Sequence, residues 1–511
     1  MKTYKLFSRL FLTFTLFFSF LMMHFAPVLH AQDGDFVWAA AMGQNLDDKG
    51  YAIFVDSSGN VYTTGYFQGT VDFDPGAGTT NLISADNNDI FISKLNSEGA
   101  LVWARSFGNT LDDEGWEIFV DSAGNVYTTG YFQNTVDFDP GTGISNLSSV
   151  GSSDIFISKL DSNGDFLGAW AMGGTAADYG YGIFVDASGN IYTTGYFQNT
   201  VDFDPSPGGI SNRTSLGVED VFVSKLDSSG NFLWAKTLGG ASSDVGLGIS
   251  LYSSGNIYIS GWFQGTVDFD PGAGVSELIS IAGSNDIYVS KLDSDGNFVW
   301  AKAMGGASED IGQAVSVDSL DNVYTTGWFN GTVDFDPGPG IFELPNSGQF
   351  GADIFISKLD SNGDFVWAKS MGGTSSDGGY GISVDTSGNV YSTGFFGGTV
   401  DFNPGAEVFD LISSGGADIF ISKLNSSGDF VWAKAMGDTS DDYGYDISVD
   451  FSGNVLTTGS FKGTVDFDPG DLGTSFHSSA GFEDIFISKL SGSDNFPWGM
   501  FLPAIIKPPV L

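Results

Sequence analysis

An acidic segment, TVDFDPG, begins at Thr70 and returns at nearly regular intervals along the chain. In an extended segment Asp72 and Asp74 point to the same side, about 7 Å apart at roughly 3.3 Å per residue. Such paired carboxylates suit calcium, although one pair supplies only part of the about six to eight oxygen ligands that the ion takes. The competing interpretation is turn chemistry, because Pro75 favours an extended Asp74 and Pro-Gly suits a tight turn.

A second acidic element, Asp-x-Gly, recurs with the same period, and its first copy is Asp48 with Gly50. An aspartate in this position is also suited to accepting backbone N–H bonds where the chain turns into a strand, and we favour that role. In the sixth TVDFDPG copy Asn403 replaces one carboxylate, which keeps an oxygen donor but removes a charge. The candidate calcium ligands are Asp48, Asp72, Asp74, Asp113, Asp137, Asp139, Asp178, Asp202, Asp204, Asp268, Asp270, Asp334, Asp336, Asp466 and Asp468.

Two further carboxylates break the repetition at a position otherwise held by small residues. The copies there are Ala52, Glu117, Gly182, Gly248, Ala314, Gly381 and Asp446. Paired carboxylates carry out glycoside hydrolysis, so Glu117 and Asp446 are the candidates for an enzyme. Other catalytic parts are scarce, since His477 is the only histidine after the N-terminal segment and Arg105 and Arg213 are the only arginines there. We therefore favour solvation of the two carboxylates by channel water and assign no catalytic residue.

Three other repeated features each have a functional and a structural interpretation. An aromatic position could stack on sugars, but packing between neighbouring blades is the favoured explanation. LDSDGNF at Leu292–Phe298 resembles part of a calcium loop, yet other copies place an ordinary hairpin turn there. The ISKL lysines, Lys94 and its equivalents, are expected to be charges at the blade edges that pair with the acidic excess. The aromatic position is held by Tyr66, Tyr131, Tyr196, Trp262, Trp328 and Phe395, with Ser460 in the last copy.

Composition and the N-terminus restrict partners and location. The formal charge of −43 repels phosphate backbones and anionic lipid headgroups, so nucleic acid is not an expected partner. Lys2, Lys5 and Arg9 precede the apolar run LFLTFTLFFSFLMM, and Ala31 follows as a small residue at a cleavage point. This is the layout of a secretory signal peptide, with an uncleaved membrane anchor as the alternative. The chain contains no cysteine, so an exported protein has no disulfides to stabilise it.

The period itself predicts the fold. The first aspartates of TVDFDPG, Asp72, Asp137, Asp202, Asp268, Asp334, Asp401 and Asp466, are 65, 65, 66, 66, 67 and 65 residues apart. Each unit holds four short segments rich in β-branched and aromatic residues, separated by turn clusters, as in GYAIFVD, NVYTTGYF, DIFISKL and ALVWARSF. Seven such units predict an all-β, seven-bladed β-propeller with four-stranded antiparallel blades and an extra TVDFDPG hairpin in each blade. An open solenoid is the alternative.

The two ends offer rival strands for closing the ring. DFVWAAAMG at Asp35–Gly43 matches the fourth strand of a unit, but no first three strands precede it. The C-terminal copy NFPWGMF carries Pro497, which restricts it to an edge. We favour closure by the N-terminal strand beside DIFISKL at Asp484–Leu490.

The segment VDSSGNVYTTGYF followed by DIFISKLNSEGALVWARSFG resembles the SBBP-type β-propeller repeat of exported bacterial proteins, from Asp35 to about Trp498. The resemblance implies a β-propeller and no single activity. Residues 1–31 are accordingly expected to be a signal peptide, 35–501 the propeller, and 502–511 a short apolar tail. We expect a secreted or cell-surface monomer, with the periplasm as a further location and no membrane span after cleavage.

The sequence therefore predicts a non-enzymatic binding or structural module for a protein or glycan ligand on the acidic loop face, with calcium as the candidate cofactor. The alternative is a carboxylate-dependent glycoside hydrolase that acts on neutral glycans.

Overall fold

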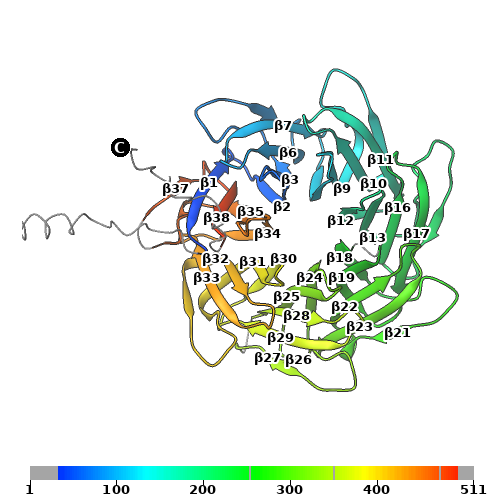
Figure 1. Cartoon of the computed structure of the whole chain (residues 1–511). Helices are drawn as coiled ribbons and strands as arrows, with labels where there is room; N and C mark the ends of the chain where they lie inside the picture. The colour runs from blue at the N-terminus through cyan, green and yellow to red at the C-terminus, as the bar shows by residue number, and fades with distance from the viewer. Residues whose placement is uncertain (1–32, 253–254, 349–350, 471–472, 493–511) are drawn as a thin grey trace, which may run out of the picture.

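The computed structural model describes residues 33–492 except 253–254, 349–350 and 471–472. Seven antiparallel sheets surround a central axis, and the strands β2, β12, β18, β24, β30 and β34 lie closest to it (Figure 1). The described residues contain no α-helix. The fold is the seven-bladed β-propeller that the repeats predict, and the open solenoid is wrong.

In each blade the strands follow one another from the central axis outward. Blade 1 consists of β2 (Lys49–Val55), β3 (Val61–Phe67), β6 (Asp89–Leu95) and β7 (Leu101–Phe107). Blade 2 consists of β8 (Glu114–Val120), β9 (Val126–Asp137), β10 (Asn146–Leu160) and β11 (Phe166–Gly174). Blade 3 consists of β12 (Tyr179–Val185), β13 (Ile191–Phe197), β16 (Asp220–Leu226) and β17 (Phe232–Gly240). Blade 4 consists of β18 (Asp244–Leu251), β19 (Ile257–Gln264), β22 (Asn285–Leu292) and β23 (Phe298–Gly306).

Blade 5 consists of β24 (Asp310–Val317), β25 (Val323–Phe329), β28 (Asp353–Leu359) and β29 (Phe365–Met371). Blade 6 consists of β30 (Gly378–Val384), β31 (Val390–Asp401), β32 (Asp410–Leu424) and β33 (Phe430–Met436). Blade 7 consists of β34 (Tyr443–Val449), β35 (Val455–Phe461), β38 (Asp484–Leu490) and β1 (Phe36–Met42).

The two middle strands of each blade are covered on both faces. This explains why apolar residues occupy successive positions along these strands and do not alternate with polar ones. Every residue of β3 and of β6 is buried. Neighbouring blades supply the cover, since Met42 of blade 7 belongs to the same buried cluster as Ile53 and Phe91 of blade 1. The SSGN cluster is a tight turn in which Asp56 Oδ1 accepts the N–H groups of Ser58 and Asn60. The hydrophobic core is thus a set of layers between blades.

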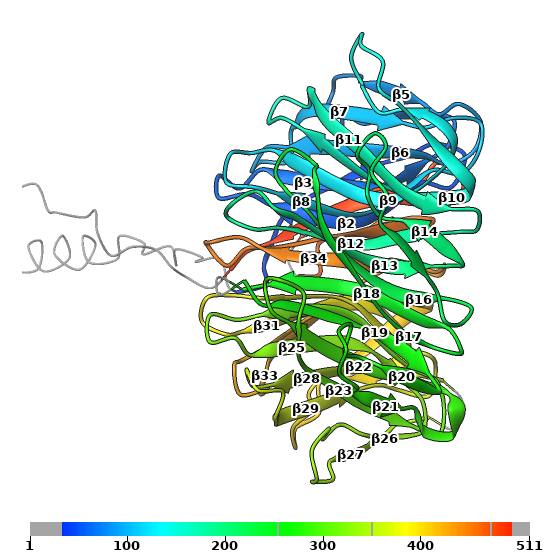
Figure 2. The same cartoon turned by 90° about the vertical axis from the view of Figure 1, so that its right-hand side faces the viewer.

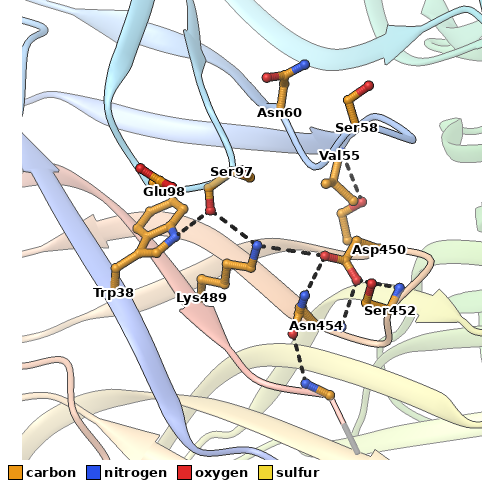
Figure 3. A network of polar contacts seen from close by, with 12 residues as sticks. Trp38, Val55, Ser58, Asn60, Ser97, Glu98, Asp450, Ser452, Asn454 and Lys489 are labelled. Atoms are coloured by element: carbon orange, nitrogen blue, oxygen red, sulfur yellow. Dashed lines mark hydrogen bonds and ion pairs between the residues drawn. The ribbon is translucent and has the colours of Figure 1, made fainter. Parts of the chain in front are cut away.

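The N-terminal strand closes the ring, as predicted. β1 pairs antiparallel with β38, from Phe36 opposite Leu490 to Met42 opposite Ile485. At this junction Trp38 Nε1 and Lys489 Nζ both donate to the carbonyl oxygen of Ser97 in blade 1, at 3.1 and 3.4 Å (Figure 3). The rival C-terminal strand NFPWGMF lies outside the described residues, and β1 occupies the position beside β38.

The TVDFDPG segments form hairpins that lean outward from one face of the ring. Separate short pairs are β4 (Thr70–Asp72) with β5 (Asn81–Ile83), β14 (Thr200–Asp202) with β15 (Asn212–Thr214), β20 (Thr266–Asp268) with β21 (Glu277–Ile279), β26 (Thr332–Asp334) with β27 (Glu343–Pro345) and β36 (Thr464–Asp466) with β37 (Phe476–Ser478). In blades 2 and 6 the hairpin continues β9 and β10, and β31 and β32. A short 3-10 helix, η1 (Ile281–Gly283), follows β21. Seen from the side, β5, β14 and β20 lie toward the same face (Figure 2).

These hairpins also join neighbouring blades, which the sequence did not predict. Asp202 of β14 pairs with Gly173 at the end of β11, the outer strand of the preceding blade. Equivalent pairs join β20 to β17 and β26 to β23. Phe73 is fully buried, with its ring 5.5 Å from that of Phe67 and 5.0 Å from that of Phe91. The repeated segment is therefore part of the packing between blades.

The predicted signal peptide, residues 1–31, and the apolar tail, residues 502–511, lie outside the described residues. Within the described part of the chain, no helix has the length and apolar character needed to cross a bilayer.

Candidate functional site

A β-bulge turns one residue of every inner strand toward the channel. In β2, Gly50 pairs with Gly65 and Ala52 with Thr64, so Tyr51 is the extra residue between the two pairs. The same shift occurs in the other six inner strands. A Cβ at Gly65 would lie 1.9 Å from the carbonyl oxygen of Lys49, which explains the glycine of VYTTGYF. Bulges of this kind re-aim a side chain, and here they aim seven side chains at the axis.

Five of these seven bulge residues are aromatic and form a continuous arc over blades 6, 7, 1, 2 and 3. The ring centroids of Tyr380 and Tyr445 are 5.6 Å apart, and those of Tyr445 and Tyr51 are 5.3 Å apart. Tyr51 stacks on Trp116 at 4.4 Å, and Trp116 meets Tyr181 edge-on at 5.0 Å. Leu247 and Gln313 hold the position in blades 4 and 5. We call the five rings the aromatic arc.

Below the aromatic arc lies a cavity of about 430 Å³ whose lining comes from the inner strands of all seven blades. The space exists because the next residue is small in most copies, including Gly248 and Ala314, which line it. In the cavity wall the buried Nε1 of Trp116 has no hydrogen-bond partner among the described residues. An unpaired buried donor is costly, so this atom is suited to a water molecule or a ligand.

Glu117 and Asp446 enter this cavity together, as the exceptions at the small position suggest. Asp446 Oδ2 accepts the N–H of Ile53 across the blade boundary at 2.8 Å, and its Oδ1 accepts the N–H of Ile447. Burial raises the pKa of Asp446 to about 7 despite these bonds. Burial, and then the charge of Asp446, raise the pKa of Glu117 well above its usual range. Two carboxylates in one enclosed site repel, so the pair retains a proton at neutral pH.

The rim around the aromatic arc is acidic. Glu114 is buried and accepts a 2.7 Å hydrogen bond from Asn88 Nδ2, and burial raises its pKa. Lys49 is the cation at the start of β2, and its Nζ lies 2.6 Å from Glu483 Oε2 of blade 7. Burial, together with the negative charge of Glu219 in blade 3, raises the pKa of Tyr181. Because Lys49 is paired with Glu483, the other two glutamates give the channel mouth an excess of negative charge.

Asp48 and its equivalents in the other six blades do not line the cavity. Each of these aspartates instead accepts two backbone N–H bonds. Asp48 Oδ2 accepts the N–H of Gln44 in the link between blades, and Oδ1 accepts the N–H of Gln68 after β3. The same pair of bonds recurs in the other six copies. Burial raises the pKa of Asp48 to about 7. This geometry agrees with the favoured role of these aspartates as backbone acceptors.

The TVDFDPG aspartates also accept local backbone bonds. Asp72 Oδ1 accepts the N–H groups of Asp74 and Thr80, and Asp74 Oδ1 accepts that of Gly76. Asn403 of the sixth copy makes the same bond to Gly405. No group of three or more aspartate, glutamate, histidine or cysteine side chains is arranged to hold a metal ion within the described ranges. Calcium binding by the fifteen candidate aspartates stays a prediction.

Calcium binding would raise the Tm in millimolar calcium chloride above the Tm in sodium chloride of equal ionic strength, because a ligand of the folded state stabilises it. Replacing Asp72 and Asp74 by asparagine in several blades should reduce that difference, measured by calorimetry. Equal melting temperatures in the two salts, with no heat of binding, would leave TVDFDPG as turn and packing chemistry alone.

Other repeated features have structural roles. Tyr131 is buried and stacks at 4.3 Å on Tyr179 of the next blade, which agrees with the packing interpretation of that aromatic position. In LDSDGNF, Asp293 Oδ1 accepts the N–H groups of Asp295 and Asn297, as in the other hairpin turns. Among the ISKL lysines, Lys94 is buried, lies over the ring of Tyr62, and donates to Ser162 O of the next blade at 3.1 Å. The expected pairing with acidic residues is seen at Lys291, Lys423 and Lys489, which form ion pairs with Asp321, Asp33 and Asp450.

The aromatic arc is the feature that sequence reasoning missed. Its signal was present, since an aromatic residue directly follows the glycine of Asp-x-Gly in five of seven copies. Strict alternation gives no indication that a bulge will turn this residue to the axis.

A second depression, of about 740 Å³, lies at the opposite end of the channel among the turns after β34, β2 and β8. Its carboxylates are engaged within their own turns, as Asp56 Oδ2 accepts bonds from Asn60 Nδ2 and Tyr62 Oη. The channel mouth with its aromatic arc is therefore the stronger candidate site.

Comparisons with known proteins agree with a repeat propeller and name no activity. No family model matches the chain, so membership in the SBBP-type family stays an expectation. The chain is 25% identical over 467 residues to an uncharacterized WD repeat-containing protein, L264, of Acanthamoeba polyphaga mimivirus, covering 78% of this chain and 33% of that protein. It is 25% identical over 177 residues to the regulatory protein FlaEY of Caulobacter vibrioides, covering 35% of this chain and 18% of that protein.

The chain thus spans a third or less of the curated relatives that it matches. Among solved structures, a protein of unknown function from Bacteroides caccae matches with 10% identity and a TM-score of 0.31, covering 65% of this chain and 93% of that one. A likeness at this level does not bear on function.

Proposed function

We propose that the protein is an exported, non-enzymatic β-propeller that binds a protein or glycan ligand at the channel mouth on the acidic loop face. The observation that carries this proposal is the cavity of about 430 Å³ under the aromatic arc. Ligand sites are typically concave, lined by apolar and aromatic side chains, and supplied with a few polar groups. Glu117, Asp446 and the unpaired Nε1 of Trp116 are such polar groups.

Export and family membership rest on the sequence. The basic, apolar and small-residue order of residues 1–31 supports a cleaved signal peptide, and the SBBP-type repeat resemblance supports a secreted or cell-surface protein.

The proposal is tested by a glycan and cell-surface protein array probed with the mature chain and two variants. Trp116→Leu changes the wall of the cavity, and Phe451→Ala is the matched control, because Phe451 is an aromatic residue 81% exposed in the turn after β34 at the other end of the channel. We expect captured ligands to be lost with Trp116→Leu and kept with Phe451→Ala. Binding that neither substitution changes would place the ligand site elsewhere.

A glycoside hydrolase that acts on neutral glycans is the second candidate, because Glu117 and Asp446 share one enclosed cavity and retain a proton. The backbone bonds to both oxygens of Asp446 favour a structural role for that carboxylate. Reducing-sugar release from the array glycans decides between binder and hydrolase. Release by the wild type that disappears in Glu117→Gln would establish the hydrolase.

A further inference from the structure

We propose that the channel mouth takes an alkylammonium group, the side-chain amine of a lysine in a basic protein segment. This inference rests on the proposed function, since it names the ligand class of the same site. It draws on the ring arrangement of the aromatic arc, the carboxylates beneath it, and the charge of the rim.

The aromatic arc supplies the first part of a cation site. Five rings from Tyr380 to Tyr181 follow one another at centroid distances of 4.4 to 5.6 Å and line the same cavity. The negative faces of tyrosine and tryptophan rings attract ammonium groups. Tyr51 and Trp116 stack face to face on each other, and all five rings border the cavity. The arc covers blades 6, 7, 1, 2 and 3, so an entering chain meets the smaller wall of Leu247 and Gln313 on the other side.

The carboxylates beneath the arc supply the second part. Glu117 and Asp446 lie in the same cavity, and the charge of Asp446 acts on Glu117. Each oxygen of Asp446 accepts one backbone N–H, which leaves one of its two acceptor positions for a further donor. An ammonium group between the two carboxyls would offset their repulsion and donate up to three hydrogen bonds.

The rim makes a cation a better occupant than a neutral or anionic ligand. The charges of Glu114, Glu219 and Glu483 act on rings of the aromatic arc. Lys49, which also interacts with Tyr445, is already paired with Glu483. A cleft lined by one sign of charge raises the local concentration of the opposite sign. The formal charge of −43 for the whole chain acts in the same direction.

A pair of peptides tests the inference directly. The probes are acetyl-Gly-Gly-Lys-Gly-Gly-amide and the same peptide with norleucine, which keeps the alkyl chain but lacks the ammonium group. By isothermal calorimetry at low salt with the mature chain, we expect the lysine peptide to bind at least tenfold more tightly than the norleucine peptide. Equal affinity of the two peptides, or displacement of the lysine peptide by a neutral oligosaccharide, would overturn the inference.

Variants separate a local site from the general charge of the protein. Glu117→Gln and Trp116→Leu should each weaken lysine-peptide binding about fivefold or more, with melting curves confirming that the variants fold. Asp295→Asn is the matched control, because it removes one exposed carboxylate in the turn after β22 and should change the affinity by less than twofold. An equal loss in all three variants would show non-specific attraction and also reject the inference.

The outcomes distinguish this inference from the proposed function. If array ligands respond to Trp116→Leu but carry no amine, the channel mouth is a binding site for a different chemistry. If neither peptides nor array ligands respond to Trp116→Leu, the channel mouth is not the binding site and both proposals fail.

Discussion

A chain that begins at Gly43, and so lacks β1, is expected to melt about 10 °C or more below the chain that begins at Asp33. The deletion removes the outer strand of blade 7 and exposes the edge of β38. It also removes Met42, which is 1% exposed and packs with Ile53 and Phe91 between blades 7 and 1. Truncating one such buried side chain to alanine costs about 2–5 kcal/mol, so losing the strand costs more. Differential scanning calorimetry measures the change.

The decrease in Tm should be specific to the removal of β1 and partly reversible. Met42→Ala alone should reproduce a part of it, about 2–5 kcal/mol in chemical denaturation. A synthetic peptide of residues 33–42 should raise the Tm of the shortened chain, because a ligand of the folded state stabilises it. Removal of residues 493–511 is the matched control and should leave the Tm unchanged. A large loss on that C-terminal deletion, with none on removing β1, would assign closure to NFPWGMF.

Stability is expected to rise as the pH falls from 8 to 5, with the Tm increasing by about 10 °C or more. Burial raises the pKa of Asp48 from 3.8 to about 7, and that of Asp89, at the start of β6, to about 7. The equivalents of Asp48 in the other six blades also reach about 7. The equivalents of Asp89 are raised as well, to about 7 in blades 2 and 7 and about 6 in blades 4 and 6.

The sign follows from proton binding. Between about pH 4 and 7 the folded chain binds more protons at these aspartates than the unfolded chain, so acidification favours the folded state. The contribution is complete below the unfolded value of 3.8 and is lost as the pH rises through about 7. A change in pKa from 3.8 to about 7 is worth roughly 4 kcal/mol for one group. Oδ1 of Asp89 is buried without a hydrogen-bond partner, and its burial costs less free energy when the carboxyl group is protonated than when it is charged.

Controls separate the buried groups from general charge repulsion, which acidification also relieves. The effect of the buried aspartates should persist in about 0.5 M salt, which screens exposed charges. Asp48→Asn should reduce the slope of stability with pH, whereas Asp295→Asn, on an exposed turn, should not. A Tm that falls between pH 8 and pH 5 would show that these aspartates are charged in the folded protein.

The candidate site was predictable only in part. Glu117 and Asp446 stood out because they interrupt a small-residue position, and the structure places both in one cavity. The aspartates of TVDFDPG attracted a metal hypothesis because carboxylates are visible in sequence, whereas their backbone donors are not. Asp72 accepts the N–H of Thr80 eight residues later, and that bond depends on how the hairpin folds back.

The sequence by itself determined the number of blades and the strands within them, because strand periodicity and turn chemistry are local. It favoured the N-terminal strand for closure but left the C-terminal copy as a rival, and the pairing of β1 with β38 decided between them. The tertiary structure decided which residues from different repeats meet at the channel. Ring closure brings Asp446 against Ile53 and beside Glu117, although they are far apart in the chain. The bulge after Gly50 turns Tyr51 onto Trp116, and alternation along one strand cannot predict that contact.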